Sequence, residues 1–400
     1  MKVAVLGAGF QGVCVALELA KQGIACDLYD QGGVPITQAG LINEGKIHLG
    51  YVYGKDPTLN TARKLMKGAL TFHAYLNRWM KCNPGTVKIS EQFQYLVHAN
   101  SILQPQQIEA YFKDLEELYK EVSQETGLSY LGLNNDTFYE RQTDLDGYSD
   151  KILASYQTIE RSVDPLDIAH ELRREVMQNG RIQFLHDHLV QGVDYENNHY
   201  TVRSSNTISC AARQYSHVIN CLWGGRYKID RDFGVVTSDS SIVRYKVAIH
   251  LTLKYHHQLP TFTIIQGPFG DLVNFTQNRI YLSWYPSCMI GIADAKNQPD
   301  WDHLLDDSRR DQILNECLSE LGAIIPELPT VICPSSIHSK RIEGGLICAR
   351  GKEDITSSKS ELHHRYEIGL HSLGDYHSVD TGKYSMAPYF AVQVVKRITG

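Results

Sequence analysis

The sequence lacks several features that would place it in a large functional class. It has no basic excess, because 39 Lys and Arg residues stand against 45 Asp and Glu, a net charge of −6. A nucleic-acid partner is therefore not expected. No stretch approaches the roughly 18 to 20 uninterrupted apolar residues of a membrane span. The first residues lack a basic segment, a long apolar segment and a small-residue cleavage site, so we expect a cytoplasmic location.

Cysteine, metal-ligand and hydrolase patterns are also missing. The nine cysteines form neither a C-x-x-C pair nor a regular framework, as is typical of reduced thiols in a cytosol-like compartment. Histidines and acidic residues show no metal-ligand spacing, so we predict no metal site. The G-x-S-x-G turn of Ser/His/Asp hydrolases does not occur. With 42% hydrophobic residues, the chain is nevertheless able to build a sizeable core.

Apolar periodicity divides the chain into alternating strand and helix patterns. Residues 2–6 predict a strand, 13–21 a helix and 25–29 a second strand. Alternation between residues 242 and 285 predicts a mostly antiparallel sheet, with runs at 247–253, 262–265 and 280–285. Further helices are expected at residues 56–79, 105–125, 166–179, 302–321 and 387–398, and further strands at 92–97, 182–185, 200–203, 208–211, 217–221 and 366–370. The order predicts a chain that crosses between two domains several times.

A G-x-G-x-x-G motif occupies residues 7–12, directly after a strand pattern and before a helical one. In this setting Gly7 permits the tight turn, Gly9 lets the backbone approach a pyrophosphate, and Gly12 allows the helix to pack closely on the strand. Asp30, 23 positions after Gly7, is placed to accept hydrogen bonds from an adenosine ribose. The motif predicts a bound dinucleotide and leaves FAD and NAD both open.

Three later segments extend this beginning. Residues 43–51 read NEGKIHLGY, residues 162–165 read SVDP before a helical pattern, and residues 217–224 read HVINCLWG. With the first strand-helix-strand unit, they resemble the D-amino-acid oxidase superfamily of FAD-dependent oxidoreductases, which includes glycine and sarcosine oxidases and 2-hydroxyglutarate dehydrogenases. In that family the three segments run beneath the flavin ring, re-enter the cofactor domain and approach the pyrophosphate. The resemblance covers nearly the whole chain and implies FAD as the cofactor.

The resemblance also implies the domain organisation. The fold expected is α/β, with a discontinuous Rossmann-like FAD-binding domain and a mostly antiparallel-sheet α+β substrate domain. We predict that residues 1–90, 161–235 and 338–400 form the FAD-binding domain. Residues 91–160 and 236–337 would then form the substrate domain.

The reactive end departs most from the family. Cys348-Ala349-Arg350-Gly351 takes the place of a G-L-R-P turn whose arginine binds the substrate carboxylate, which implies that role for Arg350; an arginine in an exposed loop is the alternative. Sarcosine oxidase relatives carry a flavin-bonded cysteine near this turn, but a buried free thiol is favoured for Cys348. The resemblance places His48 against the flavin, as a tuning residue or a base, with a core histidine as the alternative.

The last loop, residues 374–384, takes the place of the family's G-H-G-x-x-G turn before the final helix. Its backbone amides, with Lys383, are expected to stabilise negative charge on the reduced flavin. The predicted catalytic residues are His48 and Arg350. The residues predicted to hold FAD are Gly7, Gly9, Gly12, Asp30, Gly45, Lys46, Ile47, His48, Val190, Cys221, Trp223, Gly224, Cys348, Gly374, Gly382, Lys383 and Tyr384.

The reaction predicted first is oxidation of the C–N bond of an amino acid or related small amine by hydride transfer to flavin N5. The substrate is expected to carry a carboxylate. A neutral amine needs little acid–base help, whereas an alcohol needs a base within hydrogen-bond reach, and His48 is the candidate. A FAD-dependent 2-hydroxy acid dehydrogenase is therefore the alternative. A non-catalytic flavin-binding module and a flavin-free nicotinamide dehydrogenase also stay open, as does the electron acceptor.

Overall fold

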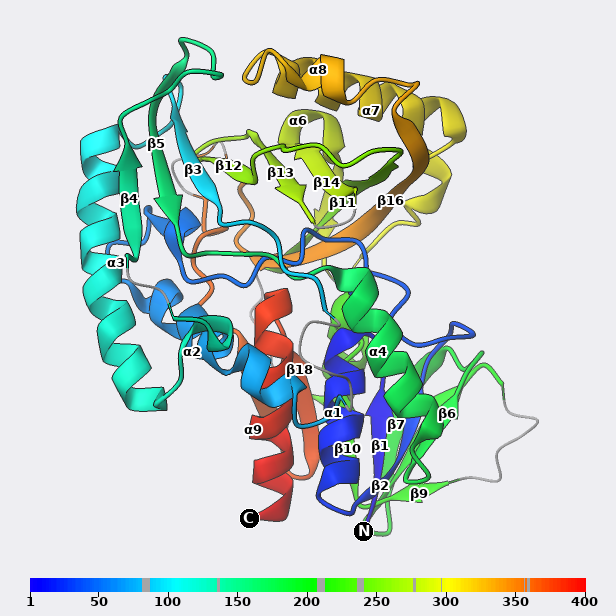
Figure 1. Cartoon of the computed structure of the whole chain (residues 1–400). Helices are drawn as coiled ribbons and strands as arrows, with labels where there is room; N and C mark the ends of the chain where they lie inside the picture. Colours follow the sequence, from blue (N-terminus) through cyan, green and yellow to red (C-terminus); the bar gives the residue numbers. More distant parts are fainter. Residues whose placement is uncertain are drawn as a thin grey trace.

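The strands among the described residues form three sheets, and helices cover their faces (Figure 1). The computed structural model describes residues 1–80, 87–134, 137–206, 213–235, 241–275, 278–295, 297–355, 357 and 360–400. One sheet is mostly parallel and a larger one is mostly antiparallel. This arrangement confirms the mixed α/β fold that the sequence predicts.

The first sheet unites strands that lie far apart in the sequence. β1 pairs in parallel with β2 and β10, β2 with β6, and β10 with β18, while β17 runs antiparallel to β18. Because parallel strands end at one edge of a sheet, the loops that follow them converge there. In spatial order the strands are β17 (Gly369–Leu373), β18 (Tyr376–Asp380), β10 (His217–Asn220), β1 (Lys2–Leu6), β2 (Ala25–Tyr29) and β6 (Ile182–Leu185).

Helix α1 (Phe10–Lys21) is enclosed between the first sheet and its neighbours α9 (Ala387–Thr399) and α4 (Pro165–Gln178) (Figure 1). Every residue of α1 before Lys21 is buried, as expected of a helix that is apolar around most of its circumference. Helix α4 begins where the Asp164 carboxylate accepts a hydrogen bond from the Leu166 amide at 2.9 Å, which satisfies one of the free amides of the first turn.

The second sheet is antiparallel except where β12 runs parallel to β3. β11 and β16 pair along most of their lengths at one side of it. In spatial order the strands are β15 (Met289–Asp294), β11 (Ser241–Leu253), β14 (Arg279–Trp284), β13 (Gly270–Asn274), β12 (Phe262–Ile265), β3 (Gln94–His98), β5 (Ile152–Thr158) and β4 (Tyr139–Gln142), with β16 (Ile337–Arg350) also on β11.

Strand β11 has two chemically different faces. Tyr245, Val247 and Ile249 belong to a core that includes side chains of α7 (Asp307–Gly322). Arg244 and Lys246, at the alternate positions, line a cavity instead. Since side chains alternate between the two faces of a strand, the core fixes which residues of β11 reach the cavity.

The remaining elements complete the layers around these sheets. Helix α3 lies at the side of β4, and α2 lies below β4 and β5 in the view (Figure 1). Helices α7 and α8 cover the second sheet at the top of the view. The elements are β7 (Val190–Glu196), β8 (His199–Ser204) and β9 (Gln214–Tyr215) of the third sheet, helices α2 (Asn60–Leu76), α3 (Pro105–Thr126), α5 (Arg226–Phe233), α6 (Tyr285–Cys288) and α8 (Leu328–Val331), and the short 3-10 helices η1 (Tyr51–Tyr53), η2 (Tyr130–Gly132), η3 (Trp223–Gly225), η4 (Asp302–Leu304) and η5 (Tyr384–Met386).

Three local predictions near the carboxy terminus are wrong in detail. Residues 374–384 are not one loop, because β18 lies within them and pairs with β10 inside the first sheet. The strand expected at 366–370 begins at Gly369. The turn expected at 348–351 is preceded by a strand that continues to Arg350, where it pairs with Ser241. Each of these strands depends on a partner distant in sequence, which a local pattern does not reveal.

Two other predictions concern the length of a helix and one short strand. Helix α7 begins at Asp307 rather than at residue 302, because the Asp306 side chain caps it by accepting a hydrogen bond from the Arg309 amide at 2.7 Å. The strand predicted at 208–211 lies outside the described residues.

The predicted domain boundaries place β16 with the cofactor domain, whereas its pairing joins it to β11 of the second sheet.

Candidate functional site

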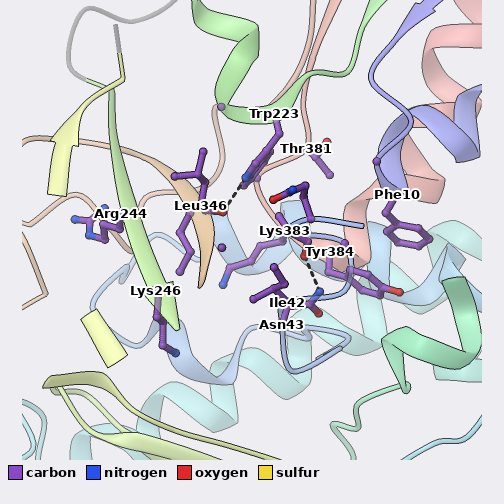
Figure 2. A pocket seen from close by; sticks show the side chains of 18 of the residues that line it. Phe10, Ile42, Asn43, Trp223, Arg244, Lys246, Leu346, Thr381, Lys383 and Tyr384 are labelled. Carbon is purple, nitrogen blue, oxygen red and sulfur yellow. Dashed lines mark hydrogen bonds between the residues drawn. The ribbon is translucent and has the colours of Figure 1, made fainter. Parts of the chain in front are cut away.

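A cavity of about 900 Å³ lies where the first sheet meets the second. Residues that follow β1, β2, β6, β10 and β18 all line it, so it occupies the carboxyl edge of the parallel strands, where α/β proteins bind ligands. Strands β11, β12, β13, β14 and β16 supply the opposite wall. Figure 2 shows side chains from both sides, including Phe10, Trp223, Lys246 and Lys383, around this space.

The glycine turn meets the cavity at Gly9. Gly7 has a φ of +92°, and a Cβ added to it would lie 2.9 Å from the Cys221 oxygen. A Cβ on Gly12 would lie 1.8 Å from the Gly7 oxygen, so both residues are packed against the chain itself. Gly9 lines the cavity, and a Cβ there would meet no protein atom within 4 Å. The open space at the amino terminus of α1 therefore fits a pyrophosphate.

Asp30 lies beside the same turn and lines the cavity. Its carboxylate accepts hydrogen bonds from the Ala8 amide at 2.7 Å and from the Gly32 amide at 2.8 Å. Burial raises the pKa of Asp30, although these amides oppose the effect. Asp30 thus ties the end of β2 to the glycine turn, and the remaining acceptor capacity of its carboxylate suits a ribose hydroxyl.

The predicted site residues divide into those that reach the cavity and those that do not. Those that line it are Gly7, Gly9, Asp30, Lys46, His48, Val190, Cys221, Trp223, Gly224, Gly382, Lys383 and Tyr384. Those outside its lining are Gly12, Gly45, Ile47, Cys348, Arg350 and Gly374. Gly374 lies in the turn before β18, at the opposite edge of the sheet from the loops that converge on the cavity.

Gly45 and Ile47 hold the segment that carries Lys46 and His48. Gly45 has a φ of +65°, and a Cβ there would lie 1.9 Å from the Val163 oxygen. The Val163 amide donates to the Gly45 oxygen at 2.9 Å, and the Ile47 amide donates to the Arg161 oxygen at 3.0 Å. Because Gly45 and Ile47 are held against the backbone of residues 161–163, the side chains of Lys46 and His48 lie at the cavity.

His48 is buried between two carboxylates. Its Nδ1 lies 3.8 Å from Oε1 of Glu160, and its Nε2 lies 3.8 Å from Oε1 of Glu44, which lines the cavity. Nδ1 has no hydrogen-bond partner among the described residues. Burial, followed by the charges of Lys383 and Lys46, lowers the pKa of His48 well below 6.5. The imidazole is therefore neutral at pH 7 and able to accept a proton.

Glu160 is a residue that the sequence patterns did not single out. It is fully buried, and its carboxylate accepts hydrogen bonds from the Leu49 amide at 2.5 Å and from the Tyr95 hydroxyl. Burial raises the pKa of Glu160, while Lys46 acts in the opposite direction. No motif marks Glu160 in the sequence, where it stands two residues before Ser162. Only its position behind His48 in the structure distinguishes it from a surface acid.

Lysines surround the same end of the cavity. Lys46 donates to Thr263 Oγ1 at 2.5 Å and lies 3.2 Å from Asp271 Oδ1. Burial, followed by the charge of Arg365, lowers the pKa of Lys383 to about 8. The Lys383 ammonium lies 5.8 Å from the centre of the Tyr53 ring. Other residues that line the cavity are Tyr53, Arg365, Arg244 and Lys246. The last two lie before the run predicted at 247–253, and the signal that could have found them is their two-residue spacing within the alternating pattern that begins at residue 242.

Residues 2–339 match the model of the family described as FAD dependent oxidoreductase, DAO. The chain belongs to this family. It is therefore an oxidoreductase with FAD as its cofactor. This excludes two alternatives that the sequence left open, a flavin-free nicotinamide dehydrogenase and a non-catalytic flavin-binding module. No curated protein sequence matches the chain at a significant level.

Solved structures share the fold of this FAD-dependent oxidoreductase at low sequence identity. Glycine oxidase from Geobacillus kaustophilus is 10% identical with a TM-score of 0.68, covering 99% of this chain and 94% of its own. Iminodiacetate oxidase from Chelativorans sp. BNC1 is 12% identical with a TM-score of 0.65, covering 100% and 95%. L-alpha-glycerophosphate oxidase from Mycoplasma pneumoniae, solved with FAD bound, is 13% identical with a TM-score of 0.65, covering 100% and 94%.

Arg350 lies away from the cavity of this oxidoreductase. Its side chain is 35% exposed and forms ion pairs with Glu367 and, at 3.7 Å, with Glu361. Both partners are at the surface, so the guanidinium is neutralised outside the cavity. The alternative stated for Arg350 is an arginine in an exposed loop, whereas the structure places it at the end of β16.

Cys348 is also directed away from the cavity. It is buried in a small apolar cluster with Tyr227, Val243 and Ala295, and burial raises the pKa of its thiol to about 12. A protonated thiol is a poor nucleophile. We therefore expect acid precipitation of the purified yellow protein to leave FAD in the supernatant, measured by its absorbance, with no flavin in the washed pellet. Flavin that stays with the protein would contradict this expectation.

Two further findings hold for the part of the chain that the structure describes. In it, no helix is long and apolar enough to cross a membrane. No group of three or more His, Cys, Asp or Glu side chains within it could hold a metal ion.

Proposed function

We propose that the oxidoreductase oxidises a carbon that bears a hydroxyl group in a small molecule, with His48 as the base. The observation that carries this proposal is the buried, neutral imidazole at the cavity, backed by the Glu160 carboxylate. An alcohol gives up its proton only to a base within reach, and His48 supplies one. Bound FAD supplies the hydride acceptor at N5.

In this proposal Nε2 of His48 takes the hydroxyl proton, because Nε2 faces Glu44 on the cavity side. As the proton leaves and the carbon gives up its hydride, the oxygen becomes the carbonyl oxygen of the product. Glu160 faces Nδ1 and would stabilise the imidazolium that forms, as a carboxylate does behind other histidine bases. Gly9, Asp30, Lys383 and Tyr384 would hold the cofactor around the rest of the cavity.

Oxidation of a C–N bond, the reaction expected first from the sequence, is the second candidate. It is supported by structural neighbours named iminodiacetate oxidase, glycine oxidase and L-proline dehydrogenase. A neutral amine lone pair drives hydride loss without a base, so this reaction would leave His48 without its proposed role. The hydroxyl reaction uses the geometry of the site more fully.

Anaerobic reduction of the purified holoenzyme separates the two candidates. We would mix it with 2-hydroxy acids, polyol phosphates, D- and L-amino acids and N-methyl amino acids, and follow the loss of oxidised-flavin absorbance. Bleaching by a hydroxy compound, at a rate at least tenfold above any amine, is the expected result. Bleaching by amines alone would overturn the hydroxyl proposal and support C–N oxidation.

The pH profile of the same reaction gives a further prediction. The low pKa of His48, set mainly by burial, keeps its base form available at neutral pH, so kcat/KM should fall only at a pH well below 6.5. The Lys383 charge is lost as the pH rises through about 8, so a second decline should begin there. Steady-state rates from pH 5 to 10 would test this bell shape; a rate that is flat across the acid limb would contradict a histidine base.

We also propose a cytoplasmic location and a FAD that is held without a covalent bond. The described cysteines are free thiols, which supports a reducing compartment. The domain boundaries predicted from the sequence are kept as a proposal, with β16 assigned to the second sheet because of its pairing with β11.

A further inference from the structure

Arg350 lies outside the cavity, so an acidic substrate would need another partner. Strand β11 offers one on the wall opposite the glycine turn. Arg244 and Lys246 are two positions apart on the face of β11 that lines the cavity, while Tyr245 between them packs into the core on the opposite face. Figure 2 shows Arg244 and Lys246 on this strand, with Lys383 across the same pocket.

The Arg244 side chain is buried in the wall of the cavity, and one nitrogen of its guanidinium has no hydrogen-bond partner among the described residues. Its side chain is 1% exposed, Nε lies 3.0 Å from Asp354 Oδ1, and Nη2 donates to the Glu353 oxygen at 3.0 Å. The Tyr285 hydroxyl donates to the same Asp354 oxygen at 2.6 Å. Nη1 is buried and has no partner among the described residues. A buried donor without a partner is unfavourable, and a bound anion would relieve this.

Lys246 adds a positive charge that is not neutralised by a carboxylate of its own. Its Nζ donates to the Ser283 hydroxyl at 3.2 Å, and no ion pair of Lys246 occurs within the described ranges. Asp271, the nearby acid, is engaged by Lys46 and Thr263. Burial lowers the pKa of Lys246, but Tyr281 and Asp271 raise it by more, so the ammonium stays charged.

We propose that Arg244 and Lys246 bind the acidic group of the substrate, a carboxylate or a phosphate, on the wall formed by β11. A fixed guanidinium and a nearby ammonium suit the oxygens of either group. Each cation attracts an anion more strongly in a partly buried site than in water. The substrate class is thus a small anion that also carries the oxidisable hydroxyl. The inference rests on the proposed function, because it names the substrate of the same cavity.

Binding of anions that are not oxidised tests the subsite independently of turnover. Acetate, malonate and inorganic phosphate would be titrated into the holoenzyme while the flavin spectrum is recorded. We expect at least one anion to perturb the spectrum, and Arg244→Gln or Lys246→Gln to raise its Kd by about 10- to 100-fold. Comparison of acetate and malonate with inorganic phosphate distinguishes a subsite for a carboxylate from a subsite for a phosphate. An unperturbed spectrum, or an unchanged Kd in both variants, would overturn the subsite.

Controls keep the test separate from loss of folding. Arg203→Gln removes a strand arginine that pairs with Asp194 at 2.7 Å outside the cavity, and it should leave the Kd unchanged. Arg244→Lys should recover part of the affinity that Arg244→Gln loses. Each variant is compared by FAD content and Tm. Should Arg244→Gln fail to fold, Lys246→Gln carries the test alone, since Lys246 has no carboxylate partner to leave unpaired.

Turnover then links the subsite to the substrate. For any acid that bleaches the flavin, its neutral amide or dephosphorylated analogue should show a kcat/KM lower by at least 100-fold, and the two variants should raise KM for the acid more than they lower kcat. A neutral analogue that reacts as well as the acid would overturn the inference and leave oxidation intact. Anion binding without bleaching by any compound would instead support the subsite and contradict the proposed function.

Discussion

Replacing His48 by Asn is expected to lower kcat for a hydroxyl substrate by about 10²- to 10⁴-fold, the range lost with a general base. Asparagine keeps a polar side chain at the position but cannot take up a proton. His48 already lacks a hydrogen-bond partner at Nδ1, so the change removes no bond that holds the fold. The measurement is the rate of anaerobic flavin reduction at saturating substrate, with FAD content determined for each preparation.

The acid limb of the pH profile is the readout that a purely structural role of His48 would not move. In His48→Asn this limb should disappear, and the residual rate should rise with pH because hydroxide partly replaces the base. His98→Asn is the matched control, since His98 is also buried but lies on β3 outside the cavity. An amine substrate that His48→Asn oxidises within about threefold of the unmodified rate would support C–N oxidation instead.

Replacing Gly9 by Val is expected to abolish FAD binding while leaving the fold intact. Gly9 has a φ of −67° and a ψ of −178°, a conformation that any residue adopts, and an added Cβ meets no protein atom. The new side chain would occupy the space into which the pyrophosphate must come, and a 100-fold rise in Kd corresponds to about 2.7 kcal/mol. The Kd for FAD, from titration of apoprotein, should rise at least 100-fold.

Gly12→Ala should fail in a different way. Its Cβ would lie 1.8 Å from the Gly7 oxygen, so the first strand and helix could not pack, and folded apoprotein should not accumulate. Gly180→Val is the control for Gly9→Val, because its added Cβ is also free of protein contacts and Gly180 lies outside the cavity. Normal FAD affinity in Gly9→Val would contradict the placement of the pyrophosphate. Loss of apoprotein folding in Gly9→Val would do the same.

Much of the cofactor end could be predicted from the sequence because its signals are local. A strand, a tight glycine turn and a helix follow one another within residues 2–21, and steric demands on Gly7 and Gly12 arise from atoms of the same unit or of its partner strand. The predicted bounds of β1, β2, β6 and β12 agree with the structure residue by residue. Short-range periodicity and backbone sterics suffice for such units.

The reactive end could not be predicted as well, since it depends on pairings between distant segments. Whether Arg350 or Arg244 reaches the cavity is decided by the antiparallel register of β11 and β16, in which Arg350 lies opposite Ser241 at the end of the pair. A shift of one residue would exchange the two faces of either strand. Glu160 lies behind His48 although it comes 112 positions later in the sequence.

By itself the sequence determined the dinucleotide turn, the helices and strands around it and, through its family, FAD chemistry. The tertiary structure alone decided that Arg350 is paired at the surface, whereas Arg244 and Lys246 line the same space as His48 and Lys383. The physical reason is that a turn is set by the sterics of neighbouring residues. An active site is set by strand register and core packing between segments hundreds of residues apart, which fix where each charge is buried.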